Sequence, residues 1–386
     1  MAAFRKREFW LKRLAAAWRG KSVVWLSGVR RSGKTTIARS LPRVEYLDCE
    51  LPGVRRLMSQ PESFLDARRG RGRALVLDEI HRLANPSELL KVAADHYPDI
   101  RILATGSSTL GASRRFRDTL TGRKAELWLT PMMSQDLRDF AAPGLEHRLL
   151  RGGLPPFFLA ERLPEREMQE WIDSYWAKDI LELFRLERRH SFQRFVELVH
   201  AQSGGIFDAT RFARDCEAGR TTITNYLAVL EATYVAHVIR PYSARRATEI
   251  VAAPKVYGFD TGFVCHYRGV ERLRAEDLGL LWEHYVLNEI HARLQTRAVQ
   301  YWRDKRGHEV DFVFVGRGKA PVAIECKIGS ANFNGANLAA FRRGHPEGVN
   351  LVVAADVTKP FVEKHAGLRV EFVGLDSLIR RLGGVA

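Results

Sequence analysis

Short apolar runs alternate with amphipathic stretches over the first third of the chain. Residues 5–18 have the pattern of an amphipathic helix, with Trp10 and Leu14 on its apolar side together with Leu11 and Trp18. The apolar runs that follow are separated by helical stretches, which is typical of a parallel sheet covered by helices. We therefore predict an α/β fold. The predicted strands are residues 22–28, 44–48, 74–79, 100–106 and 125–130.

The rest of the chain changes character twice. Residues 140–190 are mostly helical and are interrupted by a turn at 151–157. From about residue 191, short helices give way to extended segments that continue to about residue 260. The block 274–380 begins with a helix and continues with strands, which predicts a second α/β unit. Its predicted elements are the helix 276–294 and the strands 301–304, 308–315, 320–328 and 349–355.

The segment from Gly28 to Thr35 reads GVRRSGKT and fits the phosphate-loop pattern GxxxxGK[ST] without a mismatch. A predicted strand precedes it and a predicted helix, 36–41, follows it. Two glycines let the backbone N–H groups point at a triphosphate, Lys34 reaches the β/γ oxygens, and the Thr35 hydroxyl ligates Mg²⁺. We predict that ATP is bound by Gly28, Arg31, Ser32, Gly33, Lys34, Thr35 and Thr36.

An acidic pair ends the predicted strand 74–79. The apolar residues before it bring Asp78 to the carboxyl end of the strand, where its carboxylate can hold Mg²⁺ through water. Glu79 beside it can polarise the attacking water, since phosphoryl transfer to water needs a positioned base. The pair therefore favours ATP hydrolysis over nucleotide storage or a kinase reaction.

Two further segments carry polar side chains that can act at the same site. Thr105, Ser107 and Ser108 end the predicted strand 100–106, and any of them could sense the γ-phosphate. We take Ser107 as the ATP-binding candidate, with an ordinary polar turn as the alternative. Arg123 could act as a catalytic arginine finger on a neighbouring subunit's nucleotide, and a plain surface arginine is the alternative.

The charge of the chain indicates an anionic partner. Lys and Arg number 61 against 45 Asp and Glu, a net charge of +16. This balance favours nucleic acid before a membrane surface, although a solvated basic face is the alternative.

No apolar run reaches the ~18–20 residues of a membrane helix, and the basic start lacks a secretory apolar stretch. The four cysteines show no zinc-ligand spacing. We expect a cytoplasmic protein without a membrane partner.

Residues 208–240 have the pattern of a helix-turn-helix. A first helix, about 208–216, meets a turn at 217–219. In the second helix Ile223, Leu227 and Leu230 form a buried stripe, and the segment 235–240 alternates like a wing strand. The exposed start of the second helix would meet DNA. Its DNA-binding candidates are Arg220, Thr222 and Asn225; a lid or an oligomer contact is the alternative, because residues 191–250 are nearly neutral.

The C-terminal block contains the D…(D/E)xK arrangement of metal-dependent nucleases. Glu325 and Lys327 alternate along one strand and share a face, with Asp311 beside them on the neighbouring strand. The carboxylates could bind Mg²⁺ and the lysine could stabilise the pentavalent phosphate. Glu283 is the preferred helix glutamate that completes the metal ligands, and Glu309 is the fallback. The alternatives are a surface salt bridge and a nuclease fold that only binds DNA.

Taken together, the chain resembles a prokaryotic family of AAA-type ATPases with a nuclease-like C-terminal domain. This resemblance implies a helical lid, a winged-helix module and a PD-(D/E)xK fold. Asp136 stands where the family usually has Glu, a change that affects a helix start. The predicted domains are 1–135 (ATPase), 136–190 (lid), 191–262 (winged helix) and 263–386 (nuclease-like). The matching segments are 28–36, 76–83, 102–108, 120–133, 151–157, 171–180, 255–262, 282–290, 301–315 and 323–327.

Two functions follow from these predictions. The first is a Mg²⁺-dependent ATPase that binds DNA and remodels or processes it, for example as a motor on branched DNA. This protein would self-associate, for example as a ring. The alternative is an ATP-dependent signalling or assembly switch whose C-terminal domain binds protein partners and does not cut DNA.

Overall fold

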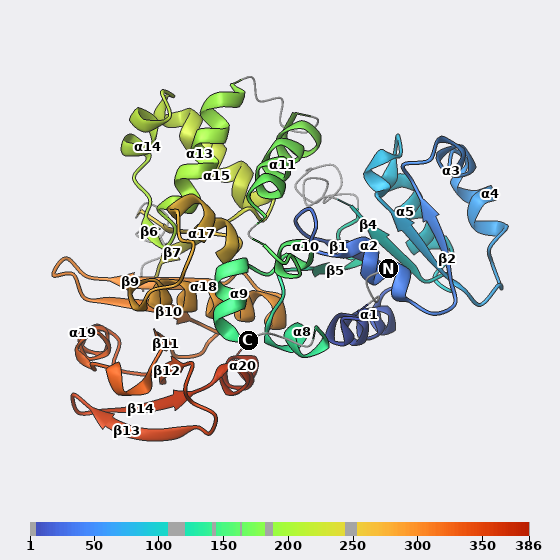
Figure 1. Cartoon of the computed structure of the whole chain (residues 1–386). Helices are drawn as coiled ribbons and strands as arrows, with labels where there is room; N and C mark the ends of the chain where they lie inside the picture. Colours follow the sequence, from blue (N-terminus) through green and yellow to red (C-terminus); the bar gives the residue numbers. More distant parts are fainter. Residues whose placement is uncertain are drawn as a thin grey trace. The chain divides into compact units, whose positions relative to one another are not determined.

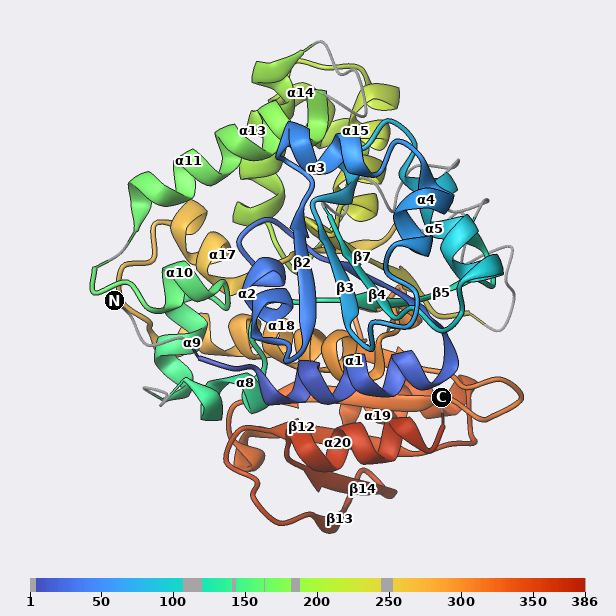
Figure 2. The ribbon, with the colours of Figure 1, turned by 90° about the vertical axis from the view of Figure 1, so that its right-hand side faces the viewer.

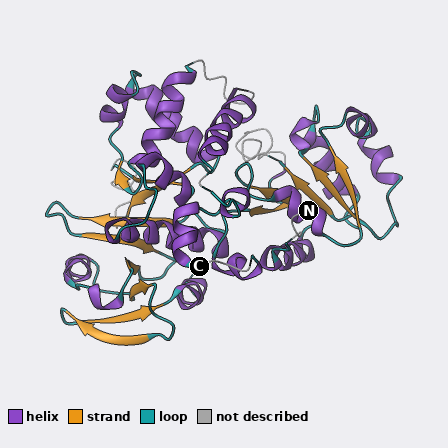
Figure 3. Cartoon of the chain, viewed as in Figure 1, coloured by secondary structure: helices purple, strands orange, loops and turns teal. Residues whose placement is uncertain are grey.

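A computed structural model describes residues 5–106, 120–140, 144–162, 164–181, 188–243 and 253–385 (Figure 1). The chain divides into two compact units, each with its own sheet and helices (Figure 3). The first unit comprises Met1–Pro143, Gly153–Gln193 and Leu227–Val235. The second unit comprises Gly144–Gly152, Arg194–Tyr226 and Ala236–Ala386.

The first unit contains a five-stranded parallel sheet in the order β2-β3-β4-β1-β5. Figure 2 shows β2, β3 and β4 side by side. Every residue of β1 is buried, as expected for a central strand that is covered on both faces. All five predicted strands are confirmed to within two residues at either end. The strands are β1 (Val23–Ser27), β2 (Val44–Asp48), β3 (Ala74–Asp78), β4 (Ile102–Thr105) and β5 (Lys124–Trp128).

Helices cover this sheet. The predicted N-terminal helix is α1 (Glu8–Gly20), which buries Trp10 and Leu14 completely and packs on β1 and β5. The apolar core includes Trp25 of β1 and Leu90 of α5. The other helical segments are α2 (Lys34–Ser40), α3 (Pro52–Leu57), α4 (Pro61–Asp66), η1 (Ile80–Arg82), α5 (Pro86–His96), α8 (Ser134–Asp139), α10 (Pro155–Phe158), α11 (Glu165–Tyr175) and η2 (Trp176–Ile180).

A buried ion pair ties the N-terminal segment to the start of α8. Asp136 is fully buried, and its carboxylate accepts hydrogen bonds from Met133 N at 3.1 Å and from Arg7 Nε at 2.9 Å. Arg7 also donates from Nη1 to Ser32 O at 2.8 Å. Asp136 thus caps a helix start, as the sequence indicated, and it also holds the arginine that supports the phosphate loop.

We expect Asp136→Ala to lower the free energy of unfolding by about 3–5 kcal/mol, because it leaves the guanidinium of Arg7 buried without its charged partner. Denaturant titration measures this change. Asp139→Ala is the matched control, because Asp139 is half-buried and accepts a backbone hydrogen bond from Glu8 N without a buried charge as its partner. Loss of this hydrogen bond should lower the free energy of unfolding by about 1 kcal/mol or less. Equal losses in the two variants would contradict the assignment.

The second unit is built on a nine-stranded mixed sheet in the order β13-β14-β12-β11-β10-β9-β7-β8-β6. The pairs β11/β12, β12/β14 and β7/β9 are parallel, and the others are antiparallel. The strands are β6 (Gly205–Ile206), β7 (Ala236–Pro241), β8 (Lys255–Gly258), β9 (Val299–Arg303), β10 (Glu309–Phe314), β11 (Val322–Lys327), β12 (Asn350–Ala354), β13 (Phe361–His365) and β14 (Leu368–Val373). The helical segments are α9 (Leu145–Arg151), α14 (Ala209–Asp215), α17 (Thr261–Arg268), α18 (Ala275–Leu294), η3 (Ser330–Asn332), α19 (Ala336–Gly344) and α20 (Leu375–Gly383), while α13 (Arg189–Ala201) and α15 (Arg220–Ala232) each have residues in both units.

This sheet continues across residue 262, where the sequence predicted a domain boundary. The β7 strand, predicted as the wing of the winged helix, pairs in parallel with β9 of the C-terminal block and antiparallel with β8. The division into four domains therefore stays a prediction, and it is not visible as a break in the sheet.

The predicted helix-turn-helix corresponds to α14 and α15. The side chain of Asp208 caps α14 by accepting from Thr210 N and Arg211 N. In α15 Ile223 and Leu230 are fully buried, whereas Arg220 and Asn225 are exposed and Thr222 is half-buried. The two helices and the exposed start of the second helix are as predicted; contact with DNA stays a prediction.

Candidate nucleotide-binding and hydrolysis site

The loop between β1 and α2 needs both of its glycines. Gly33 has φ +99° at the start of α2, a conformation that side-chain-bearing residues rarely adopt. A Cβ atom on Gly28 would lie 2.5 Å from Leu129 O, a clash with backbone. Only glycine at these two positions therefore lets the loop adopt this conformation. The loop forms the phosphate cradle that the sequence pattern predicts.

Lys34 is the first residue of α2, and its side chain lies inside the loop. Its Nζ donates to Gly28 O at 2.8 Å and to Val29 O at 3.0 Å. Burial lowers the pKa of Lys34, while the negative charges of Glu79 and Asp179 act in the opposite direction. The loop thus buries the Lys34 side chain at its centre, beside the position that the pattern assigns to the β- and γ-phosphates.

Asp78 ends β3 and is held by side chains from both neighbouring strands. Tyr46 of β2 donates its hydroxyl to Oδ2, and Thr105 of β4 donates its hydroxyl to Oδ1. The sequence suggested Thr105 as one of three sensors of the γ-phosphate, but in the structure its hydroxyl hydrogen bonds to Asp78. Thr105 therefore positions the Asp78 carboxylate.

Glu79 follows with φ +53°, in the left-handed region that non-glycine residues rarely occupy outside functional sites and turns. Its backbone N–H donates to Thr105 Oγ1 at 3.2 Å, and its Oε2 lies 3.1 Å from His81 Nδ1. Burial alone would raise the pKa of Glu79, but the contact with His81 and the charge of Lys34 outweigh it and lower the pKa to about 2. The carboxylate is therefore ionised at neutral pH and can accept a hydrogen bond from water.

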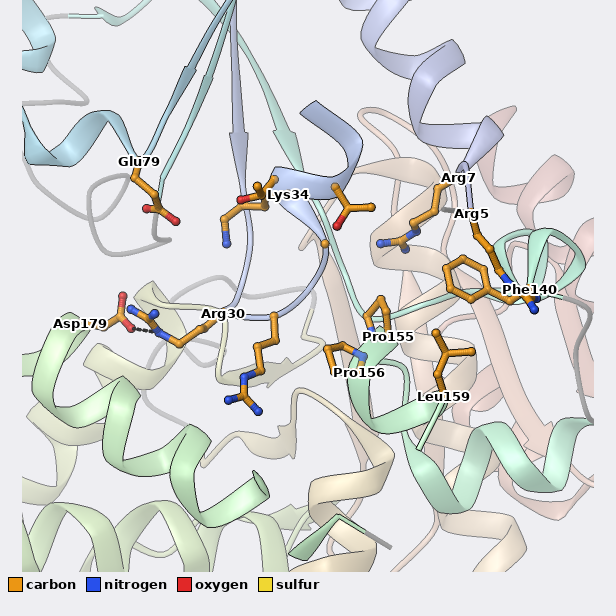
Figure 4. Close-up of a pocket in the computed structure, with 14 residues that line it drawn as sticks. Arg5, Arg7, Arg30, Lys34, Glu79, Phe140, Pro155, Pro156, Leu159 and Asp179 are labelled. Carbon is orange, nitrogen blue, oxygen red and sulfur yellow. Dashed lines mark hydrogen bonds and ion pairs between the residues drawn. The ribbon is translucent and has the colours of Figure 1, made fainter. Parts of the chain in front are cut away.

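Lys34 and Glu79 line a cavity of about 490 Å³, a volume within the range of small-molecule sites (Figure 4). Glu79, Arg30 and Asp179 lie on one side of Lys34, and Arg5, Arg7 and Phe140 lie on the other. The cavity is rich in cations and also has an apolar wall. Its lining includes Arg5, Arg7, Arg30, Arg31, Lys34, Thr35, Thr36, Phe140, Pro155, Pro156 and Leu159.

Residues from α11 and η2 contact the phosphate loop directly. Trp171 Nε1 donates to Arg30 O at 3.0 Å, and Arg30 Nε donates to Asp179 Oδ2 at 3.3 Å. Asp179 is buried and lies in a π-helical turn, a rare geometry that is frequent at functional sites. Sequence reasoning missed Asp179 and Arg7 as site residues, although Asp179 lies within the segment 171–180 that carried the family resemblance.

Two further residues were predicted to act at this site. Ser107 lies outside the described residues. Arg123 precedes β5 at the amino edge of the sheet, and its Nε donates to Asp95 Oδ1 at 2.8 Å. The phosphate loop follows the carboxyl end of β1, roughly 16 Å away along the parallel strands. Arg123 therefore lies away from the phosphate loop of its own chain, and its action on a neighbouring subunit's nucleotide stays a prediction.

The C-terminal candidates lie together on β10, β11 and α18. Asp311 Oδ2 accepts from Cys326 N at 2.7 Å, and Lys327 Nζ lies 3.0 Å from Glu325 Oε2. Burial raises the pKa of Asp311, and the charges of Glu283 and Glu325 raise it further. Burial also raises the pKa of Glu325. The sequence thus identified a real cluster of ionisable groups.

The same cluster contains a lysine that sequence reasoning missed. Lys255 of β8 places its Nζ 3.0 Å from Glu283 Oε1 and 2.7 Å from Glu309 Oε1. Within the described ranges, no three or more His, Cys, Asp or Glu side chains are arranged to hold a metal ion. The predicted Mg²⁺ ligands Glu283, Asp311 and Glu325 lie close together in the fold, and Mg²⁺ binding by them stays a prediction.

The sheet order, the phosphate loop after β1 and the acidic pair after β3 define an AAA-type P-loop fold. Residues 20–137 match a family model described as an AAA domain. Residues 142–274 and 278–366 match two models described as Domain of unknown function (DUF8612) and Domain of unknown function (DUF4143). The predicted α/β fold class is therefore confirmed; the winged-helix and nuclease-like assignments stay predictions.

Similar proteins have been found in curated sequences and among solved structures. Uncharacterized proteins of Mycobacterium bovis and Mycobacterium tuberculosis are each 28% identical over 329 residues, covering 82% of this chain and 72% of theirs. A Walker-type ATPase of Pyrococcus abyssi is 16% identical, with a TM-score of 0.43, covering 68% of this chain and 95% of its own. AMPPCP-bound DnaA of Aquifex aeolicus is 14% identical, with a TM-score of 0.28, covering 58% and 88%. Among the described helices, none has the length and apolarity needed to span a membrane.

Proposed function

We propose that this protein is an ATP-hydrolysing AAA-type ATPase that binds and remodels or processes DNA. The observation that carries the proposal is the meeting of Lys34, Thr35 and Glu79 at one cation-lined cavity, with Asp78 next to Glu79 at the end of β3. A charged lysine in a glycine cradle suits a triphosphate, and an ionised glutamate beside it suits the activation of water.

The residues present fit Mg²⁺ and ATP at this site. Mg²⁺ takes most of its ligands from phosphates and water, so that one or two protein oxygens are sufficient. The Thr35 hydroxyl and the Asp78 carboxylate would supply them, and the bound ion would neutralise phosphate charge. The apolar wall of Phe140, Pro155 and Leu159 suits the base of ATP.

In the proposed reaction each group of the chain has a separate task. Lys34 and the neighbouring arginines Arg30 and Arg31 bind the triphosphate and stabilise the charge of the transition state. Glu79 orients water for attack on the γ-phosphate and accepts its proton. Tyr46 and Thr105 hold Asp78 in place by their hydrogen bonds.

The proposal that DNA is the partner rests on charge and on exposed side chains. The net charge of +16 would attract a polyanion, and Arg220 and Asn225 are exposed at the start of α15, with Thr222 half-buried beside them. We also propose that the chain self-associates and that Arg123 acts as a finger on a neighbouring subunit; its distance from its own phosphate loop supports this. A ring is the arrangement that would repeat this contact at every site.

The second candidate is a signalling or assembly switch. It is favoured by the ion pair between Arg30 of the phosphate loop and Asp179 of η2, because a bound triphosphate would compete for Arg30. Nucleotide state would then alter the helical segment without any role for DNA.

DNA binding and ATP turnover together distinguish the two functions. With duplex, single-stranded, forked and four-way DNA, we expect binding to stimulate ATP turnover and to weaken steeply with salt. On duplex DNA the logarithm of the binding constant falls linearly with the logarithm of the salt concentration, and each lost phosphate contact should make this slope shallower by ~0.9. Arg220→Ala tests one such contact. Arg166→Ala removes an equal charge from an exposed site on α11 and serves as the control. ATP turnover indifferent to every DNA would favour the switch.

A further inference from the structure

The carboxylate cluster of the second unit already contains a buried cation. The side chain of Lys255 is only 4% exposed, and its ammonium bridges Glu283 of α18 and Glu309 of β10. The Tyr257 hydroxyl also donates to Glu283 Oε1. The rings of Tyr257 and Tyr301 have their centroids 5.4 Å and 5.9 Å from Nζ, within reach of a cation–π interaction. Two carboxylates and two aromatic rings therefore enclose this ammonium.

One oxygen of each carboxylate in the cluster is engaged by the chain itself. Glu283 Oε1 accepts from Lys255 and Tyr257, and Glu309 Oε1 accepts from Lys255. Asp311 Oδ2 accepts from the backbone N–H of Cys326, and Glu325 Oε2 is paired with Lys327. Mg²⁺ requires oxygens at about 2.0–2.1 Å in octahedral geometry, which side chains turned toward ammonium groups do not supply.

Displacement of Lys255 by an incoming ion is unfavourable. The lysine would have to leave two charge-assisted hydrogen bonds, and its ammonium would remain beside a divalent cation in a buried site. Its Nζ lies 3.0 Å from Glu283 Oε1 and 2.7 Å from Glu309 Oε1, between the two carboxylates. The lysine therefore acts as their counter-ion.

We propose that Lys255 is the built-in cation of this carboxylate cluster, so that the C-terminal domain holds no divalent metal and does not cleave DNA. The cluster then stabilises the fold through the ion pairs of Lys255 with Glu283 and Glu309 and of Lys327 with Glu325.

The test uses Mn²⁺ as the probe, measured by electron paramagnetic resonance on the full-length protein without nucleotide or DNA. We expect the wild type and Asp311→Asn to bind the same amount of Mn²⁺. Lys255→Met should gain one Mn²⁺ per chain, bound at least tenfold more tightly than any Mn²⁺ in the wild type. Asp311→Asn in the Lys255→Met background should remove this gain, and Lys255→Arg should behave as the wild type.

Two results would overturn the proposal. The first is that the wild-type protein binds Mn²⁺, or cleaves any DNA with Mg²⁺, and that Asp311→Asn abolishes this binding or cleavage. The second is a folded Lys255→Met variant, by circular dichroism, that gains no Mn²⁺. If Lys255→Met does not fold, the comparison of Mn²⁺ binding between the wild type and Asp311→Asn tests the proposal by itself. Because the metal measurement uses neither ATP nor DNA, failure of the proposed ATPase or DNA function would leave its outcome unchanged.

Discussion

Replacing Lys34 with alanine is expected to abolish steady-state ATP turnover. The ammonium is the group that the phosphate loop buries at its centre, hydrogen-bonded to Gly28 O and Val29 O, and its loss removes the charge that stabilises the transferring phosphoryl group. Removal of one electrostatic group at a reacting centre lowers kcat by ~10²-fold or more. Phosphate release by the purified protein measures the effect.

Lys91→Ala provides the control for this experiment, because Lys91 is an exposed lysine on α5. Its activity should equal that of the wild type. If Lys34→Ala kept a substantial part of wild-type turnover, the assignment of the nucleotide site to the loop after β1 would be wrong.

Glu79→Gln is expected to separate nucleotide binding from hydrolysis. The substitution keeps the size of the side chain and removes the charge of a carboxylate whose pKa lies at about 2. Because Glu79 is ionised throughout the neutral range, the loss is that of an active base, and general-base catalysis contributes ~10²–10⁴-fold to a rate. Single-turnover hydrolysis should slow by a factor in this range, while the Kd for a fluorescent ATP analogue changes little.

Glu88→Gln, at an exposed position of α5, should leave both quantities unchanged. Loss of ATP binding in Glu79→Gln would show that Glu79 supports the loop and is not the residue that activates water.

The parts of the site that could be predicted from the sequence are those with local patterns. The loop from Gly28 to Thr35 and the pair Asp78–Glu79 are each continuous segments, and each follows an apolar run whose end is easily recognised. Parallel strands place such segments at one edge of the sheet, so their proximity follows from the fold class. These predictions needed no knowledge of distant contacts.

Contacts between residues far apart in the chain could not be predicted. Asp179 is 149 residues from Arg30, and Lys255 is 28 residues from Glu283 and 54 from Glu309. No spacing rule connects such residues, because their proximity depends on which strands pair and on how helices cross them. Thr105 was recognised as a residue at the end of a strand, but its role depends on the register that places it beside Asp78.

The nine-stranded sheet has a practical consequence for dissecting this protein. The matched regions 142–274 and 278–366 look separable along the chain, but β7 and β9 lie on either side of the gap between them and are hydrogen-bonded neighbours. A fragment that stops at residue 274 would leave the edge of β7 unpaired, and unpaired strand edges promote aggregation. Deletion of the C-terminal block would thus damage the strand that follows the helix-turn-helix, so point substitutions are the sounder way to assign separate roles to these regions.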